Sequence, residues 1–476
     1  MKSPSVFPLS APVLHFRGTR DSRLHFSATV REGAQVRVEG RNVPLAFIGE
    51  LAGARFFCAD FSFDTGPKGR DASMEVDGTA FPFRLCGEGE RLRIAYTSCN
   101  GGEDEDRARA FPTGRNAMWA DLLATHERDP FHLLVMGGDQ IYADAVWQEP
   151  TFRAWRAMGN ARHLAPFTPA MRQEAEAFFL QRYGEVWREA EVAAALSRIP
   201  AVMMWDDHDI SDGWGSYPDR ERLSPVAQGL FAVARRAFAL FQLGTDPDRP
   251  GEAFAAQNGA HFGRIADYGP ARLVVPDLRS ERTLVRVMDE GHALLAEGLR
   301  PSPGRHRLIV SSVPLVNVDL SRIERLLRRV GWHRYTDDLR DQWMSYAHRL
   351  EWLRVVRRLL DAARDGPVTV VSGEIHLAAR GEARRGAARG GDARGGGRVV
   401  QLTASGIAHP PPPRAFGALL DRFVRRPWRR EEIELEMLPL GRTGRRYLAE
   451  RNWLEIAVAA DLTATLHAEG SGEIDL

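Results

Sequence analysis

The sequence predicts an α/β protein whose strands and helices alternate, preceded by an all-β N-terminal region. Three observations support this fold class. Short apolar runs, too brief for helices, recur along the chain; stretches with helical spacing separate them; and residues 10–86 alternate apolar and polar side chains between frequent turns. A length of 476 residues and an apolar content of 44% suit two domains, or one large domain with an appendage.

The N-terminal region reads as a small β-sandwich. Leu24–Val30 and Ala54–Phe61 have the alternation of half-buried strands, and Gly and Asp residues punctuate the segments between them. The Gly87-Glu88-Gly89-Glu90 segment is a plausible boundary. We therefore expect a β-sandwich domain over residues 1–88 and a second domain, including a C-terminal extension, over residues 89–476.

The second domain is expected to contain buried strands alternating with helices. The strands are short apolar runs typical of a sheet covered on both faces, at Leu92–Tyr96, His132–Met136, Ala201–Met204 and Val368–Val371. Helical spacing predicts helices at 115–128, 171–197, 226–243 and 341–363, and two closing strands are expected at Trp453–Val458 and Leu462–Leu466.

Three further segments have biased composition. Arg380–Arg398 is rich in Gly, Ala and Arg and is expected to be a mobile loop of unassigned role. Pro410–Pro413 predicts an extended polyproline segment, and Arg422–Arg430 is basic around Pro427 and Trp428.

Bulk properties exclude several functional classes. A net charge of +1 gives no global case for nucleic acid or a membrane surface as partner. No apolar stretch of about 18 residues predicts membrane insertion, and the N-terminus has neither a signal peptide nor a twin-arginine pair. Three cysteines, at positions 58, 86 and 99, suit a reducing compartment, so we expect a cytoplasmic protein of undetermined oligomeric state.

A chemically reactive segment follows each of the four buried strands. Because ligands bind at the carboxyl ends of strands in open α/β sheets, these segments should converge on one hydrolytic metal centre. The segments are Thr97-Ser98-Cys99-Asn100, Gly138-Asp139-Gln140-Ile141-Tyr142, Trp205-Asp206-Asp207-His208-Asp209 and Ser372-Gly373-Glu374-Ile375-His376.

Each candidate ligand has a structural alternative. Asp139, between glycines and a tyrosine, can bridge two cations or form a turn, and Tyr142 can ligate as a phenolate or simply pack. Cys99 can ligate as a thiolate or act as a small buried hydrophobe. His376 lies two residues after Glu374, so both point the same way in an extended segment, although a core histidine is the commoner explanation.

The acidic segment after Ala201–Met204 is the most specific of the four. Its three carboxylates, including Asp207 and Asp209, repel one another unless cations or arginines offset them. Asp212 follows as a further oxygen ligand, and a solvated acidic loop is the alternative. Thiolate, phenolate and imidazole suit an iron-like ion, whereas carboxylates suit Ca²⁺, Mg²⁺ or Mn²⁺, so the combination predicts two or three cations of different hardness.

Together these segments resemble the alkaline phosphatase D (PhoD-like) branch of the calcineurin-like metallophosphoesterases. Order and spacing agree from about residue 91 to 410, and Pro276–Arg282 is similar to the family's Asp-x-Arg segment. The resemblance implies a four-layer αββα sandwich with an N-terminal immunoglobulin- or fibronectin-like domain. Two features differ: many members carry Asp where Glu374 stands, and Asn pairs where Asp212-Gly213 stands.

The resemblance also implies the ligand sets of the metals. Cys99, Asp139, Tyr142 and His376 would hold iron(III), and Asp139 would bridge to calcium. Asp207, Asp212 and Glu374 would complete the second site, where manganese, zinc or magnesium are the alternatives.

The expected function is hydrolysis of a phosphate ester by a metal-activated hydroxide in a di- or tri-metal site. His208 is the candidate for general acid or for hydrogen bonding in the transition state, with Asp207 or Asp209 orienting its ring. Arg279 binds substrate oxygens or forms a structural salt bridge. Two alternatives remain open: a phosphodiesterase acting on lipid head groups, polymers or nucleotides, and an inactive metal-binding protein on the same fold.

Overall fold

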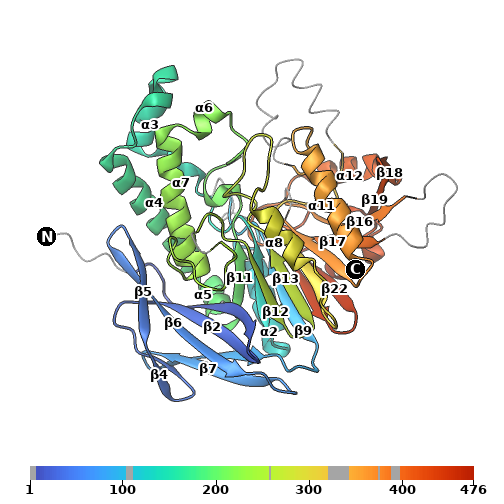
Figure 1. Cartoon of the computed structure of the whole chain (residues 1–476), viewed down its shortest axis with the longest axis horizontal. Helices are drawn as coiled ribbons and strands as arrows, with labels where there is room; N and C mark the ends of the chain where they lie inside the picture. The colour runs from blue at the N-terminus through green and yellow to red at the C-terminus, as the bar shows by residue number, and fades with distance from the viewer. Residues whose placement is uncertain (1–6, 103–110, 257–258, 320–341, 374–375, 387–396) are drawn as a thin grey trace.

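A computed structural model describes residues 7–102, 111–256, 259–319, 342–373, 376–386 and 397–476 of the chain. Two large β-sheets lie face to face and helices cover their outer faces, as Figure 1 shows. This is the four-layer αββα arrangement that the sequence predicted, with an all-β region at the N-terminus. Within these ranges, no helix combines the length and apolar character that crossing a bilayer requires.

The first sheet has ten strands and carries three of the four predicted buried strands at its centre. These three, β9, β10 and β11, pair in parallel, so their carboxyl ends meet at one edge. In spatial order the strands are β23 (Gly472–Asp475), β22 (Leu462–Ala468), β21 (Asn452–Val458), β9 (Leu92–Thr97), β10 (Leu133–Gly137), β11 (Ala201–Met204), β1 (Val13–Arg20), β2 (Arg23–Arg31), β6 (Ala54–Asp64) and β5 (Leu45–Leu51).

The second sheet has nine strands and contains the fourth predicted strand, β15. Strands β13, β14, β15 and β17 pair in parallel. The order is β12 (Arg264–Tyr268), β13 (Ala271–Val275), β14 (His306–Ser311), β15 (Val368–Ser372), β17 (Arg398–Thr403), β16 (Ala378–Arg385), β19 (Ile433–Leu438) and β18 (Trp428–Arg430), with β20 (Tyr447–Leu448) beside β16.

Side-chain alternation along the central strands divides the core into two parts. Ile94 and Val135 belong to the core shared with the second sheet, whereas Ala95 and Leu134 belong to the core under the outer helices. The helices on this side are α2 (Ala117–Arg128), α3 (Pro150–Ala157), α4 (Pro169–Trp187), α5 (Ala190–Arg198), α6 (Asp219–Arg222) and α7 (Pro225–Phe238); α8 (Gly291–Gly298), α11 (Arg349–Ala362) and α12 (Arg414–Phe423) lie on the side of the second sheet. Burial on both faces explains why these strands read as continuous apolar runs.

Short helical segments complete the architecture. They are η1 (Asp144–Gln148), η2 (Gly159–Leu164), η3 (Asp207–Asp209), η7 (Gly441–Thr443) and a π-helical turn, η4 (Ala239–Leu243), which prolongs α7. Two of them lie at predicted ligand segments: η3 is part of the segment Trp205–Asp209, and η1 begins two residues after Tyr142.

The N-terminal strands are not isolated from the rest of the fold. Strand β1 pairs in parallel with β11, so β1, β2, β5 and β6 extend the ten-stranded sheet. Strands β4 (Arg41–Val43), β3 (Val36–Val38), β7 (Arg70–Val76) and β8 (Thr79–Leu85) form a separate small sheet. The boundary at residue 88 falls between β8 and β9, and an independent domain over residues 1–88 stays a prediction.

Three expected elements differ from the structure. The single helix expected over 171–197 is two helices, because Glu189 is extended and accepts a hydrogen bond from Asn116 at 3.1 Å. The helix expected over 341–363 begins at Arg349, after turns that bury Trp343; residue 341 lies outside the described ranges. The expected loop 380–398 instead starts and ends in strands β16 and β17, since Glu434 of β19 pairs with Arg384 and offsets its charge.

Candidate metal centre

The predicted ligand segments meet at one edge of the first sheet. Because β9, β10 and β11 are parallel neighbours, the residues that follow them are brought together. Backbone hydrogen bonds tie the loops to one another: the Cys99 amide donates to the Gly138 carbonyl at 3.1 Å, and the Asn100 amide donates to the Asp139 carbonyl at 2.8 Å. The second sheet closes the site, since the Ser312 hydroxyl donates to Asp206 at 2.6 Å.

Four of the predicted ligands lie on left-handed backbone. Cys99, Asp139, Tyr142 and His376 have φ angles of 55°, 58°, 52° and 56°. The other non-glycine residues with positive φ in the described ranges lie in hairpin turns between antiparallel strands: Asp21, Ser22, Glu39, Ala52, Asp77 and Glu431. Such strain away from turns clusters at functional sites, where the surrounding structure enforces it.

The two glycines before Asp139 allow the ends of neighbouring strands to lie close together. A Cβ at Gly138, which has φ of +110°, would lie 2.8 Å from the Cβ of Asp206. A Cβ at Gly137 would lie 2.0 Å from the hydroxyl of Tyr96. Side chains at either position would therefore push the strand ends apart.

Asp139, Asp207 and His208 form the centre of the site. They offer ligand atoms that all lie within 4.8 Å of one another. Asp139 is buried, and its Oδ1 has no hydrogen-bond partner within the described part of the chain. Burial and the carboxylates of Asp206, Asp207 and Asp209 raise the pKa of Asp139 well above its usual range, although His208 opposes the shift. A bound cation would remove this electrostatic cost, so the donor set fits a metal ion.

Cys99 lies against the same carboxylate. Its sulfur is 3.4 Å from Asp139 Oδ2 and accepts a hydrogen bond from the Ser405 hydroxyl at 3.2 Å. Burial and the charge of Asp139 raise the pKa of the Cys99 thiol well above its usual value. A cation at this point would favour the thiolate, which is the ligand form of cysteine.

Three aromatic rings gather beside Cys99. The rings of His376 and His409 are stacked with centroids 3.3 Å apart, and the Tyr142 ring lies 5.5 Å from that of His409. His409 Nδ1 donates to the Pro410 carbonyl at 2.7 Å, which leaves the lone pair of the neutral ring on Nε2. His409 was not predicted from the sequence, although it follows the end of strand β17, just as the other site residues follow the ends of strands.

His208 is held by a carboxylate that was not predicted either. Its Nδ1 lies 2.8 Å from Asp144 Oδ2, and its ring stacks on Tyr142 at 4.6 Å. Burial would lower the pKa of His208, but the carboxylates of Asp144, Asp207 and Asp139 outweigh it and raise the pKa well above its usual value. Asp144 follows Tyr142 by two residues, and this position in the same segment could have identified it from the sequence as a site residue.

The structure points to a positioning role for Asp209. Its two oxygens accept hydrogen bonds from the backbone amides of Asp139, Gln140 and Asp206 and from the Gln242 side chain, all at 2.9–3.0 Å. Burial raises the pKa of Asp209 to about 7, while these hydrogen bonds oppose the shift. Asp209 thus fixes the loops that carry Asp139 and Asp207.

Arg279 also has a structural role. Its guanidinium is fully buried and donates to Asp206 at 2.5 Å, to Asp207 at 3.2 Å and to the Trp214 carbonyl at 3.0 Å. This geometry favours the structural salt bridge over a direct contact with substrate oxygens. It also orients Asp207, whose other oxygen accepts from the Gly213 amide at 2.8 Å.

One predicted ligand, Asp212, lies outside the cluster, and another, Glu374, is not described. Asp212 is exposed, and its backbone amide donates to Asp144 at 2.6 Å, but its carboxylate is not among the ligand atoms clustered around Asp139. Glu374 lies outside the described residues.

A cavity of about 340 Å³ adjoins the centre. Asp144, Asp212 and Gly213 form the part of its wall next to the site, and Trp147, Trp155 and Tyr217 supply aromatic walls. A larger cavity of about 500 Å³ lies among the N-terminal strands and residues 244–253 and is lined by none of the residues of the metal centre.

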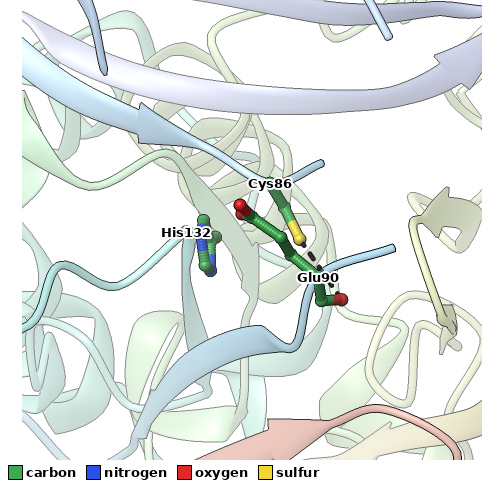
Figure 2. Close-up of side chains that lie close together, drawn as sticks. All are labelled: Cys86, Glu90 and His132. Atoms are coloured by element: carbon green, nitrogen blue, oxygen red, sulfur yellow. Dashed lines mark hydrogen bonds between the residues drawn. The ribbon is translucent and has the colours of Figure 1, made fainter. Parts of the chain in front are cut away.

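Cys86, Glu90 and His132 form a second group of metal-type side chains, shown in Figure 2. They precede β9 and β10 and therefore lie at the opposite edge of the sheet. The Arg93 backbone amide donates to His132 Nδ1 at 3.0 Å, which puts the proton of the neutral ring on Nε2. Burial and Glu90 raise the pKa of the Cys86 thiol to about 12. The neutral thiol of Cys86 and the neutral, hydrogen-bonded ring of His132 indicate a structural role, while backbone hydrogen bonds lower the pKa of the Glu90 carboxylate.

Comparisons with known proteins give one family match and one curated relative. A family model described as PhoD related phosphatase matches residues 75–334. The uncharacterized protein YGR266W of Saccharomyces cerevisiae is 24% identical over 435 residues, covering 74% of this chain. The chain spans 62% of the length of that relative.

Two solved structures share the fold. A structure of PhoD matches 100% of this chain and 93% of its own, with a TM-score of 0.57 and 11% identity. Purple acid phosphatase PPD1 from yellow lupin (Lupinus luteus) matches 97% of this chain and 72% of its own, with a TM-score of 0.50 and 10% identity.

Proposed function

The chain belongs to the family of PhoD-related phosphatases, and on this premise we propose that it is a metal-dependent phosphoric ester hydrolase. The observation that carries the proposal is the group of Asp139, Asp207 and His208, in which a buried carboxylate oxygen has no hydrogen-bond partner among the described residues. Like-charged carboxylates packed this closely require a cation, and a cation beside a histidine is suited to phosphoryl transfer.

The residues divide between two metal positions in this proposal. Cys99, Asp139, Tyr142 and His376 would hold an iron ion, and the ring of His409 stacks on that of His376. Asp139 and Asp207 would hold a second ion, calcium or another divalent cation. Bound cations supply Lewis acidity, which lowers the pKa of water and offsets charge on phosphoryl oxygens.

His208 is proposed to donate a proton to the leaving oxygen. Asp144 accepts a hydrogen bond from Nδ1–H and keeps the imidazolium charged, so Nε2 carries the transferable proton. The adjoining cavity of about 340 Å³ gives the alcohol part of the ester room beside this ring. Asp209 and Arg279 hold the loops in place and make no contact with the ester in this proposal.

The activity is tested by removing and restoring the metals and measuring hydrolysis of two substrates. The purified protein, stripped with a chelator and reloaded with iron and calcium, should hydrolyse 4-nitrophenyl phosphate, bis(4-nitrophenyl) phosphate or both, and the stripped protein should hydrolyse neither. The ratio of kcat/KM for the two substrates distinguishes a monoesterase from a diesterase. Tight metal binding without hydrolysis, across iron, calcium, manganese, zinc and magnesium, would instead support the inactive metal-binding alternative.

A further inference from the structure

Helix α12 exposes large apolar side chains on one face. Phe416, Leu419 and Phe423 are 38%, 51% and 62% exposed, and their spacing of three and four residues places them on a common stripe. The adjacent face of α12 is buried, with Gly417 and Leu420 packed toward β20. The helix is therefore anchored to the protein by one face while an apolar stripe remains in solvent.

A dense group of arginines accompanies this stripe. Residues 414–430 contain six arginines and one aspartate. Arg422, Arg425 and Arg426 are exposed, and no ion pair joins any of them to another residue in the part of the chain that the structure describes. The remaining three are paired, Arg414 with Glu450, Arg429 with Glu434 and Arg430 with Asp319.

We propose that α12 and the arginines that follow it bind the anionic surface of a lipid bilayer. The arginines would contact the head groups, while Phe416, Leu419 and Phe423 enter the boundary between head groups and acyl chains. An apolar stripe flanked by unpaired cations is the pattern of helices that lie in a membrane interface. Three unpaired guanidinium groups complement a surface of many negative charges, because each basic residue near such a surface adds to the attraction.

The helix is joined to the metal centre by a short, stiff segment. His409, which stacks on His376, is followed directly by Pro410–Pro413, and α12 begins at Arg414. Pro413 has the φ and ψ of polyproline II, −54° and 138°. Four residues in this conformation span roughly 12 Å. Membrane binding through α12 would therefore hold the metal centre close to the bilayer.

Vesicle binding tests the proposal without any turnover, so its outcome is separate from that of the proposed hydrolase activity. The full-length protein should co-sediment with phosphatidylcholine vesicles that contain about 30% phosphatidylserine, and binding should weaken at about 0.5 M salt. The triple variant Arg422→Gln, Arg425→Gln, Arg426→Gln should lose at least about tenfold in vesicle affinity. Phe416→Ser, Leu419→Ser, Phe423→Ser should lose a similar factor.

Matched variants at other positions test whether vesicle binding depends on this surface rather than on overall charge and hydrophobicity. Arg41→Gln, Arg153→Gln, Arg220→Gln removes the same charge from exposed positions, and Leu164→Ser, Leu223→Ser removes exposed apolar side chains. Both controls should bind vesicles as the unchanged protein does. Absence of vesicle binding at low salt, or equal loss in the controls, would overturn the proposal. A dimer that the apolar triple variant abolishes, without vesicle binding, would show that a second copy covers the stripe.

Discussion

At the scale of single residues, the metal centre is marked by backbone strain that coincides with ligand chemistry. Cys99, Asp139, Tyr142 and His376 each have φ between 52° and 58°. Each such residue costs of the order of 1–3 kcal/mol. The sequence could nominate these residues by type and by their place after strands. It could not show that Asp144 meets His208, because the two are 64 residues apart.

The Asp144–His208 pair yields a prediction at the same scale. Asp144→Asn removes a charge that raises the pKa of His208, so the imidazolium should deprotonate at lower pH. The alkaline limb of the pH–kcat profile should then move to lower pH, and kcat should fall by about 10- to 100-fold with metal content unchanged. His208→Asn should lose at least as much activity. An unchanged profile in Asp144→Asn would contradict the assigned role of His208.

At the scale of elements, the buried strands were predictable and the connections were not. The runs before the four ligand segments became β9, β10, β11 and β15, because burial on both faces leaves continuous apolar runs. The helix expected over 171–197 breaks at Glu189, where a contact with distant Asn116 overrides helical spacing. Strand β16 was missed because Glu434 and Glu436 of β19, which offset the charge of Arg384, come about fifty residues later in the sequence.

At the scale of the whole molecule, buried neutral histidines make the fold sensitive to acid. Burial lowers the pKa of His126, His132 and His306 to about 4 each. Between about pH 6.5 and pH 4 the unfolded chain therefore binds more protons at these groups than the folded protein does. The free energy of unfolding should fall as the pH falls through this range.

His132 offers the cleanest test of this sensitivity, because it lies at the edge of the sheet away from the metal centre. With a folded-state pKa of about 4, its share of the loss is about 2 kcal/mol at pH 5. His132→Asn keeps an acceptor for the Arg93 amide but cannot titrate. Urea unfolding at pH 7 and pH 5 should show a smaller pH-dependent loss in the variant; equal losses in both proteins would contradict the assignment.

The central claim, a catalytic metal centre built on Asp139, is tested most directly by metal analysis and 4-nitrophenyl phosphate hydrolysis of Asp139→Asn. The variant keeps the shape of the side chain but loses the charge that, in the proposal, would serve both metal positions. Compared with the exposed control Asp64→Asn, it should lose bound metal and at least about a hundredfold of the activity together. Full metal content and normal hydrolysis in folded Asp139→Asn would show that the centre lies elsewhere.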